Sequence, residues 1–160
     1  MLMKKNQKNL CIILFIMYGI ILCFILFGLN KGFWKEMPIN EYFAYLTNFI
    51  PFKTIAYYIE SIFSGNINLD ICIKNLIGPI LMFIPMGFLL PTLFAKLRNL
   101  VRFFITTTAL IVVIEILQLL TRRGSLDVDD YILGMLGVGI GLLIFKLKDV
   151  QRLLIKFNII

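Results

Sequence analysis

Apolar residues gather in four long runs along the chain, separated by shorter and more polar segments. The runs cover about residues 10–29, 71–94, 101–120 and 131–145. A helix needs roughly 20 mainly apolar residues to cross the hydrocarbon core of a bilayer, and the first three runs reach that length. The pattern predicts an all-α integral membrane bundle of four transmembrane helices, formed as a single domain over residues 1–160.

The first run, residues 10–29, has two interpretations, because lysines precede both a signal peptide and a first transmembrane helix. Its length exceeds the roughly 7 to 15 apolar residues of a signal-peptide core. Residues 30–33 supply no cleavage site of the small-x-small type. We therefore expect an uncleaved transmembrane helix.

Composition supports a membrane protein and gives an orientation. Hydrophobic residues make up 60% of the chain and charged residues 16%, against about 25% charged residues in soluble domains. The net charge of +7 forms no single basic face, so nucleic acid is not an expected partner. Ten of the sixteen Lys and Arg lie at the N-terminus, in the 96–102 loop and after residue 145. The positive-inside rule then predicts a multi-pass protein of the cell membrane with both termini in the cytoplasm.

The segment between the first two runs, residues 30–70, is rich in aromatic residues. Phe33 and Trp34 stand where an interfacial aromatic belt would begin. Further on, apolar residues recur at helical spacing and predict an interfacial amphipathic helix in an outer loop, with Pro51 breaking any helix before it. Its apolar face is Ile55, Tyr58, Ile59, Ile62 and Phe63, opposite Thr54, Glu60 and Ser61. The aromatics either anchor this loop or bind a ligand.

Glu115 is the acidic residue that lies well inside an apolar run. An ionised side chain there is costly, so we expect Glu115 to face the bundle interior or a wet cavity. Helical spacing places Thr108, Gln118 and Arg122 on the same face. This polar stripe is either a functional site or a set of hydrogen bonds that holds the helices together.

The densest charge cluster is the segment 122–130, which holds two arginines and three aspartates. Asp127, Asp129 and Asp130 immediately precede the fourth run, where carboxylates cap free backbone amides. Alternatively, Arg123 and the aspartates form a hydrogen-bonded constellation that binds a polar headgroup or a cation. The spacing of a calcium-binding loop is absent.

Glycine and cysteine add packing information. Gly137 and Gly141, with Gly134 before them, predict a face of the fourth helix where another helix packs closely, within the chain or between subunits. Cys11, Cys23 and Cys72 lack the spacing of a zinc or redox motif, and we expect them to be apolar packing residues. The chain has no His. No metal and no cofactor are expected.

Four fragments, in this order and spacing, resemble the VanZ-like family, named for a protein associated with teicoplanin resistance. They are residues 50–55, 83–91, 115–118 and 123–130, the last leading into the glycines of the fourth helix. The family often has asparagine where this chain has Pro79 and Gly134, so two polar groups are lost. The resemblance carries over a candidate polar site of Glu115, Gln118, Arg123, Asp127 and Asp130.

The resemblance implies a role in glycopeptide (teicoplanin) susceptibility or cell-envelope physiology. Our first hypothesis is a non-catalytic mechanism at the membrane surface, with membrane lipids, a lipoglycopeptide or a lipid-linked cell-wall precursor as partner. The alternative is an envelope-lipid or lipid-linked-precursor modifying enzyme, with Glu115 or Asp130 as acid or base and Arg123 holding phosphate. A proton-coupled transporter using Glu115 is less favoured, because four spans leave little room for a pathway unless the chain forms a homo-oligomer.

Overall fold

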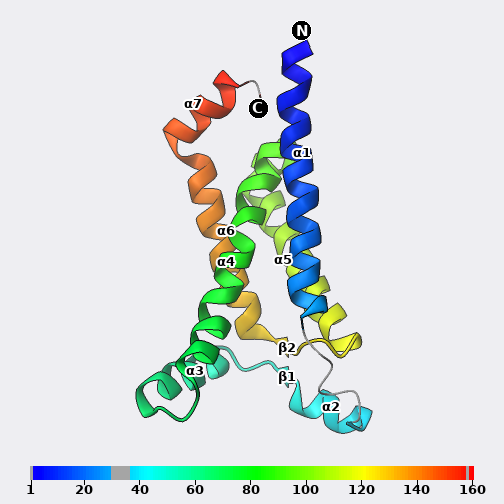
Figure 1. The fold of residues 1–160 in the computed structure, drawn as a ribbon, viewed down its shortest axis with the longest axis vertical. Coiled ribbons are helices and arrows are strands. Elements are labelled where there is room, and N and C mark those ends of the chain that lie inside the picture. The colour runs from blue at the N-terminus through cyan, green and yellow to red at the C-terminus, as the bar shows by residue number, and fades with distance from the viewer. Residues whose placement is uncertain (1, 30–36, 158) are drawn as a thin grey trace.

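Four long helices run side by side and form an elongated bundle (Figure 1). A computed structural model of the chain describes residues 2–29, 37–157 and 159–160, with side chains from residue 9 onward. The long helices are α1 (Leu2–Cys23), which continues as a π-helical turn (Phe24–Gly28), α4 (Leu69–Leu93), α5 (Leu100–Leu120) and α6 (Val128–Lys146). All four are long and apolar enough to cross a membrane. The predicted fold class is confirmed.

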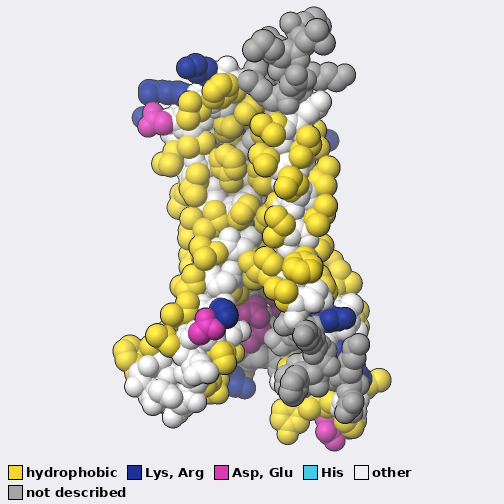
Figure 2. All heavy atoms as spheres, in the orientation of Figure 1, with side chains coloured by type: hydrophobic (Ala, Val, Ile, Leu, Met, Phe, Trp, Pro, Cys, Tyr) yellow, Lys and Arg dark blue, Asp and Glu magenta, His cyan; other side chains and the backbone are white. Residues whose placement is uncertain are grey.

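The outer surface of the bundle is what a lipid environment requires. On the face shown in Figure 2, hydrophobic side chains cover the middle of the bundle, and charged side chains lie toward its two ends. Many large apolar side chains are exposed, among them Ile20, Ile105 and Leu143, each 65–66% exposed. In water such a surface would be unfavourable, whereas in a bilayer it contacts acyl chains. The chain is therefore a multi-pass membrane protein.

The closest helix pair is α4 and α6, and glycine makes this contact possible. A Cβ atom added at Gly137 would overlap the carbonyl oxygen of Ile80, and one added at Gly141 would overlap that of Ile84. Gly87 of α4 meets α6 in the same way. The predicted glycine face thus lies inside this chain, where the two backbones touch. Gly139, on the other side of α6, has no neighbouring atom within 4 Å of an added Cβ.

A hydrophobic core fills the bundle around this contact. It is built from buried side chains of all four long helices, chiefly Leu22, Phe83, Met86, Leu90, Phe103, Ile111, Val138, Leu142 and Phe145. Cys11 and Cys72 are buried, as expected of packing residues. Cys23 is exposed on the lipid-facing side of α1, so the packing expectation is wrong for this residue.

One end of the bundle is closed by elements from two distant segments (Figure 1). The first segment supplies α2 (Ile39–Tyr45), β1 (Thr47–Asn48) and α3 (Lys53–Ser64), and the second supplies β2 (Leu126–Asp127). β1 and β2 pair in parallel, with Thr47 opposite Leu126 and Asn48 opposite Asp127. This small pairing was not predicted. At the opposite end lie η2 (Ala95–Arg98), α7 (Lys148–Lys156) and both chain ends.

The predicted amphipathic helix is α3, and it begins after Pro51, as expected. Its inner face differs from the prediction. Ser61, assigned to the polar side, is only 3% exposed, whereas Phe63, assigned to the apolar side, is 85% exposed. Ser61 satisfies its hydroxyl on the Tyr57 carbonyl at 2.7 Å and, being small, leaves room for α3 to pack against α4. Phe33 and Trp34, the predicted belt residues, lie outside the described residues.

The fourth spanning helix starts earlier than the hydropathy pattern indicated, at Val128 instead of residue 131. The reason is local, because the Asp127 side chain accepts a hydrogen bond from the Asp129 backbone N–H at 2.8 Å and caps the helix. Asp129 and Asp130 therefore belong to the first turn of α6 and project from it in different directions. This separation determines what each acid does.

Candidate functional site

Asp129 joins α6 to α3. Its side chain is fully buried, and its carboxylate accepts hydrogen bonds from the backbone N–H groups of Phe52 (2.5 Å), Thr54 (2.7 Å) and Ile55 (3.1 Å). These donors belong to the first turn of α3 and to the residue before it, where no intrahelical acceptor exists. Asp129 therefore caps a helix that lies more than 70 residues earlier in the chain. From the sequence it was expected either to cap the fourth helix or to join Arg123 in a binding constellation, and its contact with α3 was not predicted.

Asp127 extends this connection to β1. Besides capping α6, its carboxylate accepts hydrogen bonds from the Asn48 side-chain amide at 2.9 Å and the Thr54 hydroxyl at 2.6 Å. Asp127 is 7% exposed. Asp127 therefore both caps α6 and joins a hydrogen-bonded network of the protein's own groups. The predicted constellation of Arg123 with the aspartates is a different arrangement and stays a prediction. Sequence reasoning missed Asn48 and Thr54 as partners of Asp127, since hydrogen bonds across 79 and 73 residues leave no local pattern.

Tyr42 links α2 to the end of α5 at the same end of the bundle. It is 1% exposed, and its hydroxyl lies 3.1 Å from the Leu119 carbonyl oxygen and 3.0 Å from that of Gly124. The guanidinium of Arg122 lies over its ring, 5.1 Å from the centroid, and also donates to the Met37 carbonyl at 3.1 Å. Burial raises the pKa of the Tyr42 phenol, and the Arg122 charge opposes that rise.

The polar stripe predicted along α5 divides into separate contacts. Arg122 lies beyond the end of α5 with a left-handed backbone (φ 54°), and the contacts above direct it toward the first loop. The expected alignment of Arg122 with Glu115 is therefore wrong, because the helix has ended before the arginine. Thr108 lies 3.1 Å from the Tyr131 hydroxyl and so links α5 to α6. Glu115 and Gln118 alone of this stripe reach a cavity.

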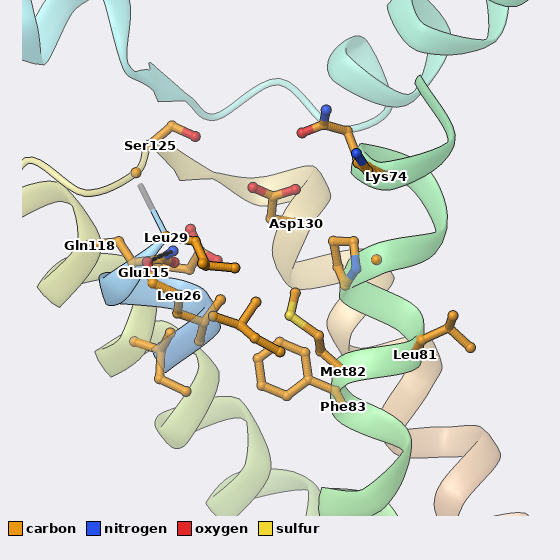
Figure 3. A pocket seen from close by; sticks show the side chains of 16 residues that line it. Leu26, Leu29, Lys74, Leu81, Met82, Phe83, Glu115, Gln118, Ser125 and Asp130 are labelled. Atoms are coloured by element: carbon orange, nitrogen blue, oxygen red, sulfur yellow. Dashed lines mark hydrogen bonds between the residues drawn. The ribbon is translucent and has the colours of Figure 1, made fainter. Parts of the chain in front are cut away.

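This cavity, of about 600 Å³, lies between the end of α1, the first half of α4, the second half of α5 and the start of α6. Its polar end is formed by Glu115 and Gln118 from α5, Asp130 from α6, Ser125 from the preceding loop and Asn75 from α4. In Figure 3 the Asp130 side chain lies between α4 and the part of α5 that carries Glu115 and Gln118. Its apolar walls include Leu26, Met82, Phe83 and Ile114.

Two carboxylates in this cavity lack the close partners that Asp127 and Asp129 have. Glu115 is 6% exposed, and its one hydrogen bond within the described residues is a long 3.5 Å contact from the Asp127 backbone N–H. Asp130 accepts no hydrogen bond from any of the residues described. The two acids are close enough for their charges to interact. A ligand with hydrogen-bond donors or positive charge would satisfy both.

The structure thus separates the five predicted site residues. Glu115, Gln118 and Asp130 meet at the cavity, and Asp127 lies behind them in the capping network. Arg123 is not among the residues found to line the cavity, although its backbone N–H donates to the Gln118 carbonyl at 2.9 Å. No group of three or more potential metal ligands occurs in the described part of the chain.

The two positions where the chain departs from the family pattern have different surroundings. Pro79 lines the cavity, so an asparagine there would have added a polar group to its wall. Gly134 lies in the packed interior, where an added Cβ would be 3.1 Å from the Phe83 ring and 3.4 Å from Ile111. A side chain at residue 134 would require Phe83 to move. Within the described lining, Glu115 and Asp130 are the acidic groups of the cavity, with Lys74 at its rim.

Comparison with protein families gives a match over most of the chain. The VanZ/LLP1 family model matches residues 12–149, which include every residue that lines the cavity. No curated protein and no solved structure gives a significant match.

Proposed function

The chain belongs to the VanZ/LLP1 family of membrane proteins, and from that premise we propose that it lowers susceptibility to glycopeptides such as teicoplanin by a non-catalytic mechanism at the membrane surface. In this proposal the α3 end of the bundle faces outward and both termini lie in the cytoplasm of the cell. The observation that carries it is the cavity in which Glu115, Gln118 and Asp130 converge.

The cavity supports a binding role because Glu115 accepts only one long hydrogen bond and Asp130 none within the described residues, while the surrounding frame is held firmly. Asp127 and Asp129 join α6 to β1 and α3, and Tyr42 joins α2 to α5. A binding site benefits from such support, since side chains that are already held lose less entropy when a ligand arrives. A lipid component held at this surface would change what a glycopeptide meets in the outer leaflet.

A modifying enzyme is the second candidate, and one observation favours it. Glu115 and Asp130 face a common cavity, as a pair of carboxyl groups acting as acid and base would. The phosphate clamp expected from Arg123 is not assembled there, which weakens this alternative. Comparing the envelope lipids and wall precursors of cells with and without the protein separates the two, because an enzyme leaves a new or depleted lipid species and a binder does not.

Susceptibility tests the cavity directly. We expect Glu115→Gln and Asp130→Asn each to shift teicoplanin susceptibility toward that of cells lacking the protein, because each removes one charge from the cavity with little change of shape. The measurement is the minimum inhibitory concentration at matched membrane levels of each variant. Asp149→Asn is the control, since Asp149 is exposed in α7, at the opposite end of the bundle, and pairs there with Arg152. Arg123→Lys should also retain function. Undiminished resistance with both cavity variants would contradict the proposal.

Orientation is tested independently. On a cysteine-free background, we expect a cysteine at Asn66, in the exposed turn between α3 and α4, to be labelled by an impermeant maleimide added to intact cells. A cysteine at Lys96, which lies in η2 at the opposite end, should be labelled only after permeabilisation. The physical reason is the excess of Lys and Arg at the η2 end, which favours retention in the cytoplasm. Labelling of Lys96→Cys in intact cells would reverse the orientation.

A further inference from the structure

We propose that the cavity binds the primary ammonium group of a membrane aminophospholipid, which enters sideways between α1 and α4. This identifies the ligand class of the site and rests on the proposed function for its role in the cell. The juxtaposition behind it is a buried carboxylate, Glu115, and a half-buried one, Asp130, both poorly partnered, in a cavity whose other walls are largely apolar.

Charge selects a cation. Glu115 and Asp130 place two carboxylates in the cavity, and Lys74 is the single Lys or Arg within the described lining. Lys74 lies at the rim, where its side chain is 72% exposed and its ammonium is 2.6 Å from Asp70. It therefore leaves the inner acids without a close counter-ion. Buried charges in a membrane protein require a partner of opposite sign, and a ligand ammonium supplies one.

The hydrogen-bonding groups select a cation that can donate. Asn75 gives its side-chain N–H to the Ile71 carbonyl at 2.8 Å, and Gln118 directs its N–H to the Leu26 carbonyl at 3.5 Å. Both amides line the cavity and keep their oxygens as acceptors. A primary ammonium has three N–H donors and a quaternary ammonium has none. The cavity therefore favours an amine headgroup over choline, for which aromatic cages are typical.

The surroundings of the cavity select a lipid. Its rim residues Leu29 and Leu81 are 59% and 60% exposed, on the side that faces acyl chains. Figure 2 shows acidic side chains within a hollow between the elements that Figure 1 labels α4 and α1. Glu115 lies five residues before the end of α5, about 8 Å along the helix axis. This depth places the acids just beneath the headgroup region.

Size and the position of Lys74 fit the same ligand. A volume of about 600 Å³ lies within the range of small-molecule sites and accommodates a headgroup with the beginning of an acyl chain. Leu26, Met82 and Phe83 form the wall along which that chain would lie (Figure 3). At the rim, Lys74 is positioned for the phosphate that follows the amine in such a lipid. A zwitterionic aminophospholipid thus matches both signs of charge.

Lipid selectivity of the purified full-length protein tests this proposal. The protein is placed in nanodiscs with equal mole fractions of phosphatidylethanolamine, phosphatidylcholine and phosphatidylglycerol, and retained lipids are measured by native mass spectrometry. We expect phosphatidylethanolamine to be retained at least about tenfold over phosphatidylcholine, the ratio that a single charge-assisted hydrogen bond would produce. Equal retention of the two, or preference for phosphatidylglycerol, would overturn the proposal. Lysyl-phosphatidylglycerol in a second disc tests whether any primary amine on a phospholipid suffices.

Two kinds of variant show where the lipid binds. The double variant Glu115→Gln/Asp130→Asn should lose the preference, whereas Asp149→Asn, an exposed acid of α7 at the opposite end of the bundle, should keep it. Gly78→Leu should also lose it, because Gly78 lines the cavity and an added Cβ meets no atom within 4 Å, so the new side chain occupies the cavity without disturbing the fold. Gly139→Leu is its matched control, with equal free space on a different surface. Unchanged selectivity in Gly78→Leu would contradict binding in this cavity.

This experiment and the susceptibility assay can fail separately. Selective amine binding without any effect on teicoplanin would retain the ligand and remove the proposed function. A normal teicoplanin effect without selective amine binding would retain the proposed function and rule out the aminophospholipid as its ligand. Melting temperatures of all variants, compared with the unmodified chain, show whether a loss of binding reflects an unfolded protein.

Discussion

Replacing Gly137 with leucine is expected to abolish most of the folded protein in the membrane. Even the Cβ of the new side chain would overlap the Ile80 carbonyl oxygen, which belongs to the backbone of α4 and cannot move aside alone. Overpacking typically costs about 1–3 kcal/mol when side chains can yield, and a backbone obstacle costs more. Proteins are stable by only about 5–15 kcal/mol. Losing the contact between α4 and α6 would therefore remove a large part of the stability of the bundle.

The measurement is the yield of monodisperse protein after mild extraction, with the melting temperature of whatever remains. Gly141→Leu should behave as Gly137→Leu does, because its added Cβ would overlap the Ile84 carbonyl oxygen. Gly139→Leu supplies the control, since it adds the same side chain to the same helix where there is open space. Equal yields for all three variants would show that α4 and α6 do not pack through a glycine face.

Removing the Asp129 carboxylate is expected to release α3 from the bundle. Asp129→Ala leaves three backbone N–H groups, those of Phe52, Thr54 and Ile55, without their acceptor. A hydrogen bond to a charged group contributes about 1.5–3 kcal/mol, and buried donors left unsatisfied carry a further penalty. The total is several kcal/mol, enough to make the docked position of α3 unfavourable while the four spanning helices remain inserted.

Ser61 provides the measurement, because it is 3% exposed in the intact bundle and faces inward from α3. With Ser61→Cys on a cysteine-free background, maleimide labelling should be slow and should become fast when Asp129→Ala is added. Asp130→Ala is the control. It removes the adjacent acid in the sequence, but that acid faces the cavity and holds no N–H group of α3. Labelling at the same rate in both double variants would disprove the capping function of Asp129.

The labelling experiment on Asp129 and the susceptibility assay on Glu115 and Asp130 divide the acids at this end of the bundle into a structural pair and a binding pair. Asp127 and Asp129 are saturated by donors from the chain, so their replacement should lower stability. Within the described residues Glu115 has only one long hydrogen bond and Asp130 has none, so their replacement should change binding and susceptibility before stability. Asp129 and Asp130 take opposite sides of this division although they are neighbours, because successive residues of a helix point about 100° apart.

Hydropathy by itself determined the architecture of this chain. A spanning helix satisfies its backbone internally and needs only enough consecutive apolar residues, so residues 71–94 and 101–120 identify themselves without knowledge of their neighbours. The spacing of Gly137 and Gly141 likewise defines a close-packed face from one helix alone. Glu115 was recognised because an acid within a long apolar run is conspicuous wherever its partners lie.

Only the tertiary structure decided which groups meet. The Asp129 carboxylate and the Phe52 N–H are 77 residues apart, and Asn48 and Asp127 are 79 apart. Such pairs leave no local periodicity, and two strands of two residues each are too short to show alternation. Both the acid that caps α3 and the acid that lines the cavity are aspartates at the start of the same helix. Asp129 could therefore not be distinguished from Asp130 until the structure showed α3 packed against Asp129. The physical reason is that hydropathy acts on each segment separately, whereas hydrogen-bond partners are chosen by the way the segments pack.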